Sequence, residues 1–380
     1  NAAMDFIRDN RGEPFLAYFS TNAPHSPLEV SEEYSAPYVA LGLDEKTARV
    51  YGMITNIDEN VGRVLELLRE LDLDDNTIVI FLTDNGPCAS QGPERFNAGL
   101  RDRKGTVYDG GIRVPCFVRW PARLEAGHEV QEIAAHIDVL PTVLDACDVP
   151  VPDGLRFDGV SLLPLMLGTA RRWPDRMLYF QWHRGDAPEL YRNCAARSQR
   201  FKLVNGQELY DMTSDPGESE DVAARHPDVV AKMRTGYEEW FAEVSAPPGY
   251  APPRIHLGTP HEDPVTLTRQ DWRGAEGWGD SDLGYWEVKV AAAGEYDVTL
   301  RFAAAEGGEE AHFRLGDVVR RERLEAGATS CVFAGVSLMA GDARLEAWLT
   351  AGGKPVGARY VDVERVPPGE APAAEAEGAG

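Results

Sequence analysis

The chain contains little that would support a zinc-thiolate, disulfide-stapled or membrane-embedded protein. Its 380 residues include only five cysteines, an odd number without a Cys-x-x-Cys pair, which indicates neither a zinc site nor a disulfide framework. No run of about 18 apolar residues occurs, so we expect no membrane span. Basic residues are also scarce, at 38 Lys and Arg against 62 Asp and Glu. The net charge of −24 repels phosphate backbones and excludes nucleic acid as a partner.

The composition predicts two domains of unequal size joined by a linker. At 43% hydrophobic content the chain can bury one large core and a second, smaller one. Residues 246–264 contain six prolines among glycines and polar residues, which predicts the linker. Apolar and polar residues then alternate with a period of two, which predicts a β-sandwich over residues 265–366. Residues 367–380 are rich in Ala, Glu, Gly and Pro, and we expect them to be disordered.

Several aromatic residues lie near the start of the predicted sandwich. Such a group can stack on sugars, but large aromatic side chains more often fill a core, and we favour the core. The residues are Trp272, Trp278, Tyr285 and Trp286.

Helical and strand patterns alternate over the first 245 residues, which predicts an α/β fold with a mostly parallel sheet. Thr77–Thr83 is a run of β-favouring residues without alternation, typical of a strand buried on both faces. An amphipathic helix precedes it, with apolar residues at spacings of three and four up to Leu68 and with Asp44 as its N-cap. Phe15–Phe19 is predicted to be a buried strand and Val114–Val118 a further short strand. Asp138 and Pro141 lie where a helix would begin. Asn205 and Gly206 predict a hairpin between two short strands, and apolar residues along one side of Pro227–Val244 predict a closing helix.

Asp84 and Asn85 follow the Thr77–Thr83 strand directly, at the edge where open α/β sheets bind their ligands. Adjacent carboxylate and amide oxygens suit a hard cation such as Ca²⁺ or Mg²⁺. A simple turn is the alternative when this stretch is taken alone. A basic glycine-rich loop follows, and its cations could provide the positive site that an anionic substrate needs in this acidic chain. They are Arg101, Arg103 and Lys104.

Five short motifs follow one another along the chain: Asn22–Pro27, Thr83–Gly86, Lys104–Pro115, His136–Thr142 and Leu209–Glu218. In this order they resemble the motifs of the type I sulfatases of the alkaline-phosphatase superfamily, and the resemblance runs from about Phe15 to about Val244. The resemblance implies a partial sulfatase domain over residues 1–245. Within it we expect an alkaline-phosphatase-like sheet core at about residues 1–170 and a small antiparallel subdomain at about residues 171–245.

The resemblance also implies roles for particular residues. Asp84 and Asn85 would ligate Ca²⁺, with Mg²⁺ as the alternative, while Lys104 would hold the sulfate near the ester oxygen. His25 would contact the sulfate or the leaving group. Structural roles near the site fall to Arg113, which would brace the Gly110–Gly111 turn, and to His136 and Asp138. The partner would be a sulfate ester of a carbohydrate or aryl group, with a sulfated polysaccharide as one candidate, and the family favours a periplasmic or secreted location.

The family's nucleophile is missing from this sequence. It is a formylglycine made from Cys or Ser in Cys/Ser-x-Pro/Ala-x-Arg, and the other metal ligands are an early pair of Asp residues. The nearest mimic is Cys194–Ser198, where Arg197 stands one place too early. We therefore expect that the chain begins after the nucleophile segment, that the formylglycine belongs to that missing N-terminal segment, and that the chain is inactive alone.

Two alternatives to a sulfatase remain open from the sequence. One is a phosphoesterase or phosphonate hydrolase of the same superfamily, because the missing segment is the part that would discriminate. The other is a non-catalytic carbohydrate-binding protein in which the sandwich binds and the α/β part is a scaffold. A scaffold has no use for the retained set of polar residues, which argues against the second alternative. That set is His25, Asp84, Asn85 and Lys104.

Overall fold

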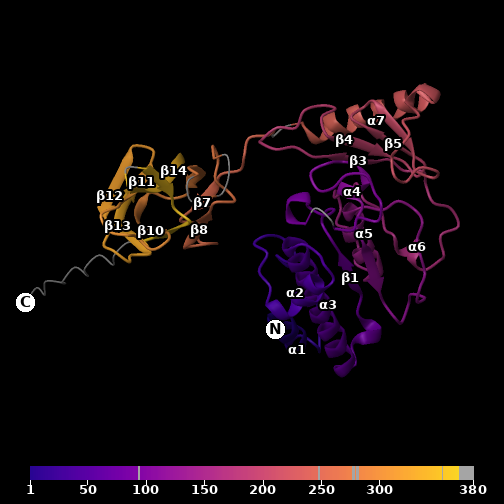
Figure 1. Cartoon of the computed structure of the whole chain (residues 1–380), viewed down its shortest axis with the longest axis horizontal. Coiled ribbons are helices and arrows are strands. Elements are labelled where there is room, and N and C mark those ends of the chain that lie inside the picture. Colours follow the sequence, from indigo (N-terminus) through magenta and orange to yellow (C-terminus); the bar gives the residue numbers. More distant parts are fainter. Residues whose placement is uncertain (93–94, 247–248, 276–278, 280–281, 353, 368–380) are drawn as a thin grey trace, which may run out of the picture. The chain divides into compact units, whose positions relative to one another are not determined.

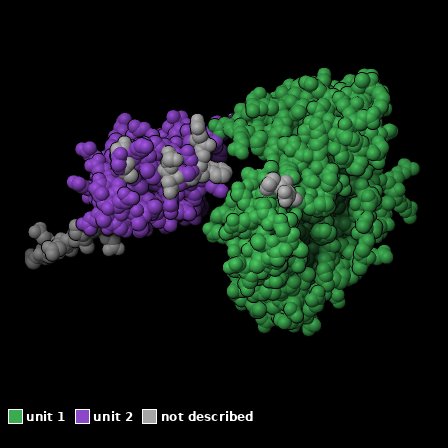
Figure 2. All heavy atoms as spheres, in the orientation of Figure 1, with its two compact units in different colours: residues 1–249 green, residues 250–380 purple. Residues whose placement is uncertain are grey.

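The chain forms two compact units, Asn1–Gly249 and Tyr250–Gly380 (Figures 1 and 2). This computed structural model describes residues 1–92, 95–246, 249–275, 279, 282–352 and 354–367. Each unit has hydrophobic clusters of its own. No helix among the described residues is long and apolar enough to cross a membrane.

Three helices open the first unit: α1 (Ala2–Asp9), α2 (Glu32–Ala40) and α3 (Glu45–Glu70). The predicted N-cap of α3 is confirmed, because the Asp44 carboxylate accepts hydrogen bonds from the backbone N–H groups two and three residues further on. Near its other end, α3 joins α1 in a small apolar cluster that buries Ile7. The helix therefore begins and packs largely as its pattern indicates.

The predicted central strand forms, but its pairing corrects the prediction of a mostly parallel sheet. β1 (Val79–Leu82) pairs with β2 (Cys116–Arg119) in antiparallel orientation, with Val79 opposite Arg119. Among the described residues these two strands make up the whole sheet. The unbroken apolar run predicted burial on both faces, but all four residues of β1 are only half-buried, and such a run says nothing of direction. Because the connection from residue 83 to 115 is long, the chain can return beside β1 in either sense.

Phe15–Phe19, predicted to be a buried strand, forms no strand and is unpaired within the described part of the chain. Leu16 and Tyr18 are 78% and 89% exposed. Phe15 alone packs inward, with its ring centroid 6.1 Å from that of Phe6. The residues suit a strand, but a strand also needs a neighbour to satisfy its backbone groups, and no described strand supplies one.

Short helices and turns connect the sheet pair to the rest of the unit. They are η1 (Asp74–Asn76), η2 (Ala89–Gln91), α4 (Asp109–Ile112), η3 (His136–Asp138), α5 (Val139–Ala146) and α6 (Leu163–Met166). The helix predicted near Asp138 and Pro141 is α5, and Pro141 lies within its first turn.

An antiparallel sheet of four strands ends the first unit, in the order β3–β4–β5–β6. The strands are β3 (Leu178–Gln181), β4 (Cys194–Arg197), β5 (Phe201–Val204) and β6 (Glu208–Asp211). The predicted hairpin is confirmed, because Asn205 and Gly206 join β5 to β6 with φ of 49° and 67°, as a type I′ turn requires. The predicted closing helix α7 (Pro227–Val244) covers this sheet (Figure 1) and buries Met233 and Tyr237 in a cluster with residues of β4, β5 and β6.

The second unit consists of two sheets that share one core. One has the order β13–β10–β16–β8, and the other has the order β12–β11–β14–β9–β7 with β15 paired to β14. Trp286 and Tyr296, one from each sheet, are fully buried in this common core. The strands are β7 (Ile255–Leu257), β8 (Val265–Thr268), β9 (Trp286–Val290), β10 (Gly294–Arg301), β11 (Glu310–Leu315), β12 (Val318–Arg323), β13 (Ser330–Leu338), β14 (Gly341–Ala351), β15 (Lys354–Gly357) and β16 (Tyr360–Arg365).

Two features at the start of this unit bear on the sequence predictions. β7 lies inside the predicted linker, residues 246–264, and Leu257 is fully buried. A strand of three residues among prolines is too short to show a period, so the sequence placed the linker's end too late. Trp272 is in the core, as favoured, with its ring centroid 5.8 Å from that of Trp286. Trp278 lies outside the described residues, as does the predicted disordered tail from residue 368 on.

Candidate active site

Asp84 and Asn85 lie two and three residues beyond the end of β1. The Asp84 side chain is exposed, and one of its oxygens accepts the backbone N–H of Asn85 at 2.9 Å. The Asn85 Oδ1 atom is buried and has no hydrogen-bond partner within the described residues. A buried oxygen without a donor costs about 1–3 kcal/mol. A cation bound at this oxygen would remove that cost, so the pair fits a hard metal ion.

This oxygen pair is only part of a complete cation site. Ca²⁺ takes six to eight oxygen ligands at high affinity. Within the part of the chain that the structure describes, no three His, Cys, Asp or Glu side chains gather as a metal site. The remaining ligands would therefore be of other kinds, such as backbone carbonyl oxygens, water or substrate.

Three glycines let the loop after β1 cross the basic loop at very short range. The N–H of Gly86 donates to the carbonyl of Gly111 at 2.9 Å. A Cβ atom on Gly86 would lie only 1.9 Å from the carbonyl oxygen of Gly110, so no larger residue fits. The N–H of Lys104 donates to the Pro87 carbonyl at 3.1 Å. The crossing therefore holds the Lys104 backbone against the turn that carries Asp84.

Lys104 itself is exposed, and its charge acts on the same turn. Burial raises the pKa of the Cys88 thiol, but hydrogen bonds with Ser90 and the positive charge of Lys104 outweigh this effect and leave the pKa below its ordinary value. The Lys104 side chain thus acts on the thiol of Cys88, three residues after Asn85.

The other two cations of the basic loop do not point into this site in the way we expected. Arg101 donates to the Tyr210 hydroxyl and to the Glu218 carbonyl, each at 2.7 Å, and its guanidinium lies 3.9 Å from the centroid of the Tyr108 ring. Arg103 donates to the Gly92 carbonyl at 3.4 Å. Arg101 therefore docks the loop onto the β3–β6 sheet, whereas Lys104 is exposed.

His25 lies on an exposed turn that is tied to the same region. Its Nδ1 atom is 3.0 Å from the Ser26 carbonyl oxygen. The Ser26 hydroxyl in turn accepts a hydrogen bond of 2.7 Å from the Gln91 side chain, in η2. The His25 turn and the segment after Asp84 are therefore joined, although they are distant in sequence.

His136, Asp138 and Arg113 occupy supporting positions. The His136 Nε2 atom is 2.8 Å from the carbonyl oxygen of Thr83, the residue before Asp84. Asp138 is fully buried, and its carboxylate oxygens lie 2.8 and 2.9 Å from a guanidinium nitrogen of Arg176. The Arg113 backbone N–H closes the glycine turn at 2.8 Å on the Asp109 carbonyl, while its side chain is exposed.

A buried charge cluster beneath the basic loop was not predicted. The Lys202 Nζ atom in β5 lies 2.7 Å from an oxygen of Asp109 and 2.7 Å from Glu218 Oε1. The second contact is an ion pair by distance without hydrogen-bond geometry, since that oxygen has no hydrogen-bond partner among the described residues. Burial raises the pKa of Glu218, and Lys202 opposes the shift. A lysine inside the apolar strand Phe201–Val204 was the signal that could have revealed this cluster.

Cys194, in the nearest mimic of the nucleophile motif, is 1% exposed in β4. Burial raises the pKa of its thiol. A protonated thiol in a core strand is neither accessible nor nucleophilic, so the rejection of this motif stands on structural grounds.

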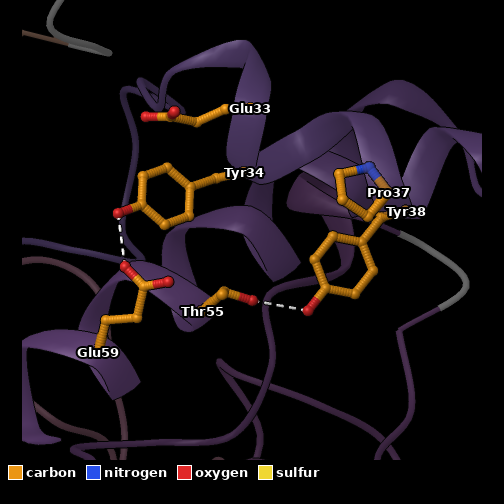
Figure 3. Close-up of a pocket in the computed structure, with 6 residues that line it drawn as sticks. All are labelled: Glu33, Tyr34, Pro37, Tyr38, Thr55 and Glu59. Atoms are coloured by element: carbon orange, nitrogen blue, oxygen red, sulfur yellow. Dashed lines mark hydrogen bonds between the residues drawn. The ribbon is translucent and has the colours of Figure 1, made fainter.

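A pocket between α2 and α3 is lined by none of these residues (Figure 3). It is lined by Glu33, Tyr34, Pro37, Tyr38, Thr55 and Glu59. The Tyr34 hydroxyl donates to Glu59 at 2.6 Å, and the Tyr38 hydroxyl lies 2.7 Å from the Thr55 hydroxyl. Because both phenols are already bonded to α3, we assign this pocket to helix packing.

Comparison with known proteins finds similarity to sulfatases. Residues 1–149 match the family model for sulfatases, and residues 98–241 match the model for the C-terminal region of N-sulphoglucosamine sulphohydrolase. The chain is 30% identical over 274 residues to an uncharacterized sulfatase, YdeN, of Escherichia coli (strain K12). The aligned region covers 62% of this chain and 48% of that protein. It is 33% identical over 187 residues to N-acetylgalactosamine-6-sulfatase of Homo sapiens, which covers 48% of this chain and 34% of that protein.

A solved structure is also similar to this chain. The crystal structure of Ps i-CgsB in complex with k-i-k-neocarrahexaose is 27% identical, with a TM-score of 0.57 over 63% of this chain and 53% of that chain. The chain thus spans about half the length of these relatives, or less. Through residues 1–241, this chain belongs to the sulfatase family.

Proposed function

We propose that the first unit is the substrate-holding part of a sulfuric ester hydrolase. The observation that carries the proposal is the buried Asn85 Oδ1 atom, which lacks a partner among the described residues and adjoins the exposed Asp84. The Lys104 loop is hydrogen-bonded to the same turn. A cation and a lysine in one place suit a substrate with concentrated negative charge, such as a sulfate ester.

Each retained residue has a distinct role in this proposal. Asp84 and Asn85 would hold Ca²⁺, or alternatively Mg²⁺, which when bound neutralises the negative charge of the sulfate oxygens. Lys104 would donate to a sulfate oxygen and then to the ester oxygen as that atom gains charge. His25 would contact the sulfate or the leaving group. His136 would position the strand end through the Thr83 carbonyl.

Residues 1–380 contain no Cys/Ser-x-Pro/Ala-x-Arg motif, so the formylglycine that the family uses would have to come from outside them. Without an attacking group, positioned charges hold a sulfate ester but do not cleave it. We therefore infer that this chain alone is inactive.

The relatives favour a carbohydrate as the substrate. One is an N-acetylgalactosamine-6-sulfatase, and another was crystallised with a neocarrahexaose. We accordingly place a sulfated carbohydrate, including a sulfated polysaccharide, ahead of an aryl sulfate, and a sulfate ester ahead of a phosphate ester. The purely carbohydrate-binding alternative loses support, because Trp272 is buried in the core of the second unit.

Calcium binding provides the first test. Ca²⁺ at ten times its Kd should stabilise the first unit by about 1.4 kcal/mol, which calorimetry detects as a higher melting temperature. Asp84→Ala and Asn85→Ala should each reduce this effect, whereas Glu45→Ala, an exposed acid in α3, should not. Equal calcium stabilisation in all four proteins would refute the assignment of the cation.

Turnover provides the second test. The purified chain should release no 4-nitrocatechol from 4-nitrocatechol sulfate at any calcium concentration. Measurable turnover that Lys104→Ala abolishes would show that a nucleophile exists within residues 1–380, and the inferred inactivity would be wrong.

A further inference from the structure

Trp182 is an exposed aromatic residue beside the proposed sulfate-holding lysine. It directly follows β3 and is 38% exposed. A Cβ atom on Gly105, the residue after Lys104, would lie 3.7 Å from Cζ2 of the Trp182 indole. The ring therefore lies against the Lys104–Gly105 turn, although 77 positions separate Trp182 from Gly105 in the sequence.

Hydrogen bonds hold the indole and the turn together. The Trp182 backbone N–H donates to the Asn193 carbonyl at 3.0 Å. The Asn193 side-chain amide donates to the Gly105 carbonyl at 2.8 Å. Asn193 thus binds both the Trp182 backbone and the Gly105 backbone. These two hydrogen bonds keep the indole beside the Lys104–Gly105 turn.

The indole is not there to fill a core. Trp240, on α7, stacks on Tyr179 with ring centroids 5.3 Å apart and joins an apolar cluster. Trp182 belongs to none of the hydrophobic clusters of the described residues. A tryptophan that leaves apolar ring surface in water gives up part of the stabilisation that burial would provide. An exposed indole held in place is therefore suited to contact a ligand.

Two basic residues lie near this indole. Lys104 precedes the turn against which the ring packs, and the Arg184 guanidinium lies 5.8 Å from the ring centroid. In a chain of net charge −24, such a local pair of cations selects an anionic ligand. The ring adds an apolar wall, which the C–H face of a pyranose matches and a bare inorganic anion does not.

We infer that Trp182 is the stacking wall for the sugar ring of a sulfated pyranose whose sulfate is held at Lys104. Arg184 contacts a second anionic group on the same or the adjacent sugar. The inference rests on the proposed function, and it adds the residue that distinguishes a sulfated sugar from free sulfate.

Nuclear magnetic resonance titration of the whole ¹⁵N-labelled chain in calcium tests this inference. The ligands are N-acetylglucosamine 6-sulfate, N-acetylglucosamine and inorganic sulfate. The sugar sulfate should shift both the Gly105 amide and the Trp182 indole N–H, whereas inorganic sulfate should shift the Gly105 amide alone. Trp182→Ala should weaken the sugar sulfate about tenfold, or about 1.4 kcal/mol, and leave the Kd for inorganic sulfate unchanged.

Two further variants serve as controls. Trp182→Phe keeps a ring and should retain most of the affinity, and Trp348→Ala removes a half-buried indole from β14 of the second unit and should have no effect. Equal sugar-sulfate affinity in wild type and Trp182→Ala would overturn the stacking role while leaving the proposed function intact. If Lys104→Ala left the Kd for inorganic sulfate unchanged, or if neither sulfated ligand gave a saturable shift, the proposed function would fail and this inference with it.

Discussion

Lys202→Met should destabilise the first unit more than any exposed charge substitution. Lys202 and Glu218 are fully buried and Asp109 is 6% exposed, so the variant would leave two carboxylates in the interior without their cation. Breaking a buried ion pair from one side costs about 3–5 kcal/mol. At about 2–4 °C per kcal/mol for a unit of this size, the melting temperature should fall by roughly 6–20 °C.

Calorimetry of the whole chain measures this loss as a shift of the first unit's transition. Arg225→Met is the matched control, because it breaks the Arg225–Glu220 ion pair of 2.8 Å between side chains that are 60% and 66% exposed. Exposed pairs contribute about 0–1 kcal/mol, so the control should melt close to wild type. Equal melting temperatures for the two variants would refute the idea that Lys202 stabilises the first unit through its buried ion pairs.

Two companion measurements separate charge from packing. Lys202→Met combined with Glu218→Gln should recover part of the loss, because fewer unpaired charges remain buried. Burial already raises the pKa of Glu218 above its usual value, and removing Lys202 should raise it further. When the pKa of a carboxyl is higher in the folded state than in the unfolded state, the protein loses stability as pH rises from the unfolded-state pKa through the folded-state pKa. The stability of Lys202→Met, compared with wild type, should therefore be higher in mild acid than at neutral pH. A loss independent of pH would assign the cost to packing.

Two further outcomes follow from other parts of the chain. The Arg200 guanidinium holds the pKa of Asp211 at about 2. A carboxyl whose pKa is lower in the folded state stabilises the protein above its unfolded-state pKa, and this stability is lost as pH falls toward the folded-state pKa. Between pH of about 4 and about 2, wild type should therefore lose more stability than Asp211→Asn, and parallel denaturation curves for the two would contradict this. Residues 250–367 expressed alone should melt cooperatively, because their two sheets share one core, and Trp286→Ala should cost them about 3–5 kcal/mol by calorimetry. A fragment without a transition would show that the second unit depends on the first.

The local structure of this chain was readable from its sequence wherever neighbours in sequence decide it. The Asp44 cap and the Asn205–Gly206 hairpin depend on residues acting on backbone close by, and α7 follows from apolar residues spaced along one side of a helix. All three formed as predicted. The order of the sulfatase motifs was likewise a property of the sequence, and it was sufficient to indicate the family.

Contacts between distant residues decided the rest. The direction of β2 beside β1 and the unpaired state of Phe15–Phe19 depend on which strands meet, and an apolar run does not encode that choice. Arg101 shows the same limit, since its position in the basic loop suggested the substrate, but Tyr210 and Glu218 hold it elsewhere.

The site residues themselves show how this division arises. The sequence identified Asp84, Asn85 and Lys104 because the chemical groups of their side chains are known without the fold. It did not reveal that Gly86 crosses Gly110 at a distance that only glycine allows, since such a clash exists only once both loops are folded. The partners of Trp182 and Lys202 likewise depend on the fold, although a lysine within the apolar strand Phe201–Val204 is a sequence signal for a buried charge. A tryptophan or a lysine has the same side chain wherever it lies, and its role here follows from the burial, charge and backbone that the tertiary structure brings around it.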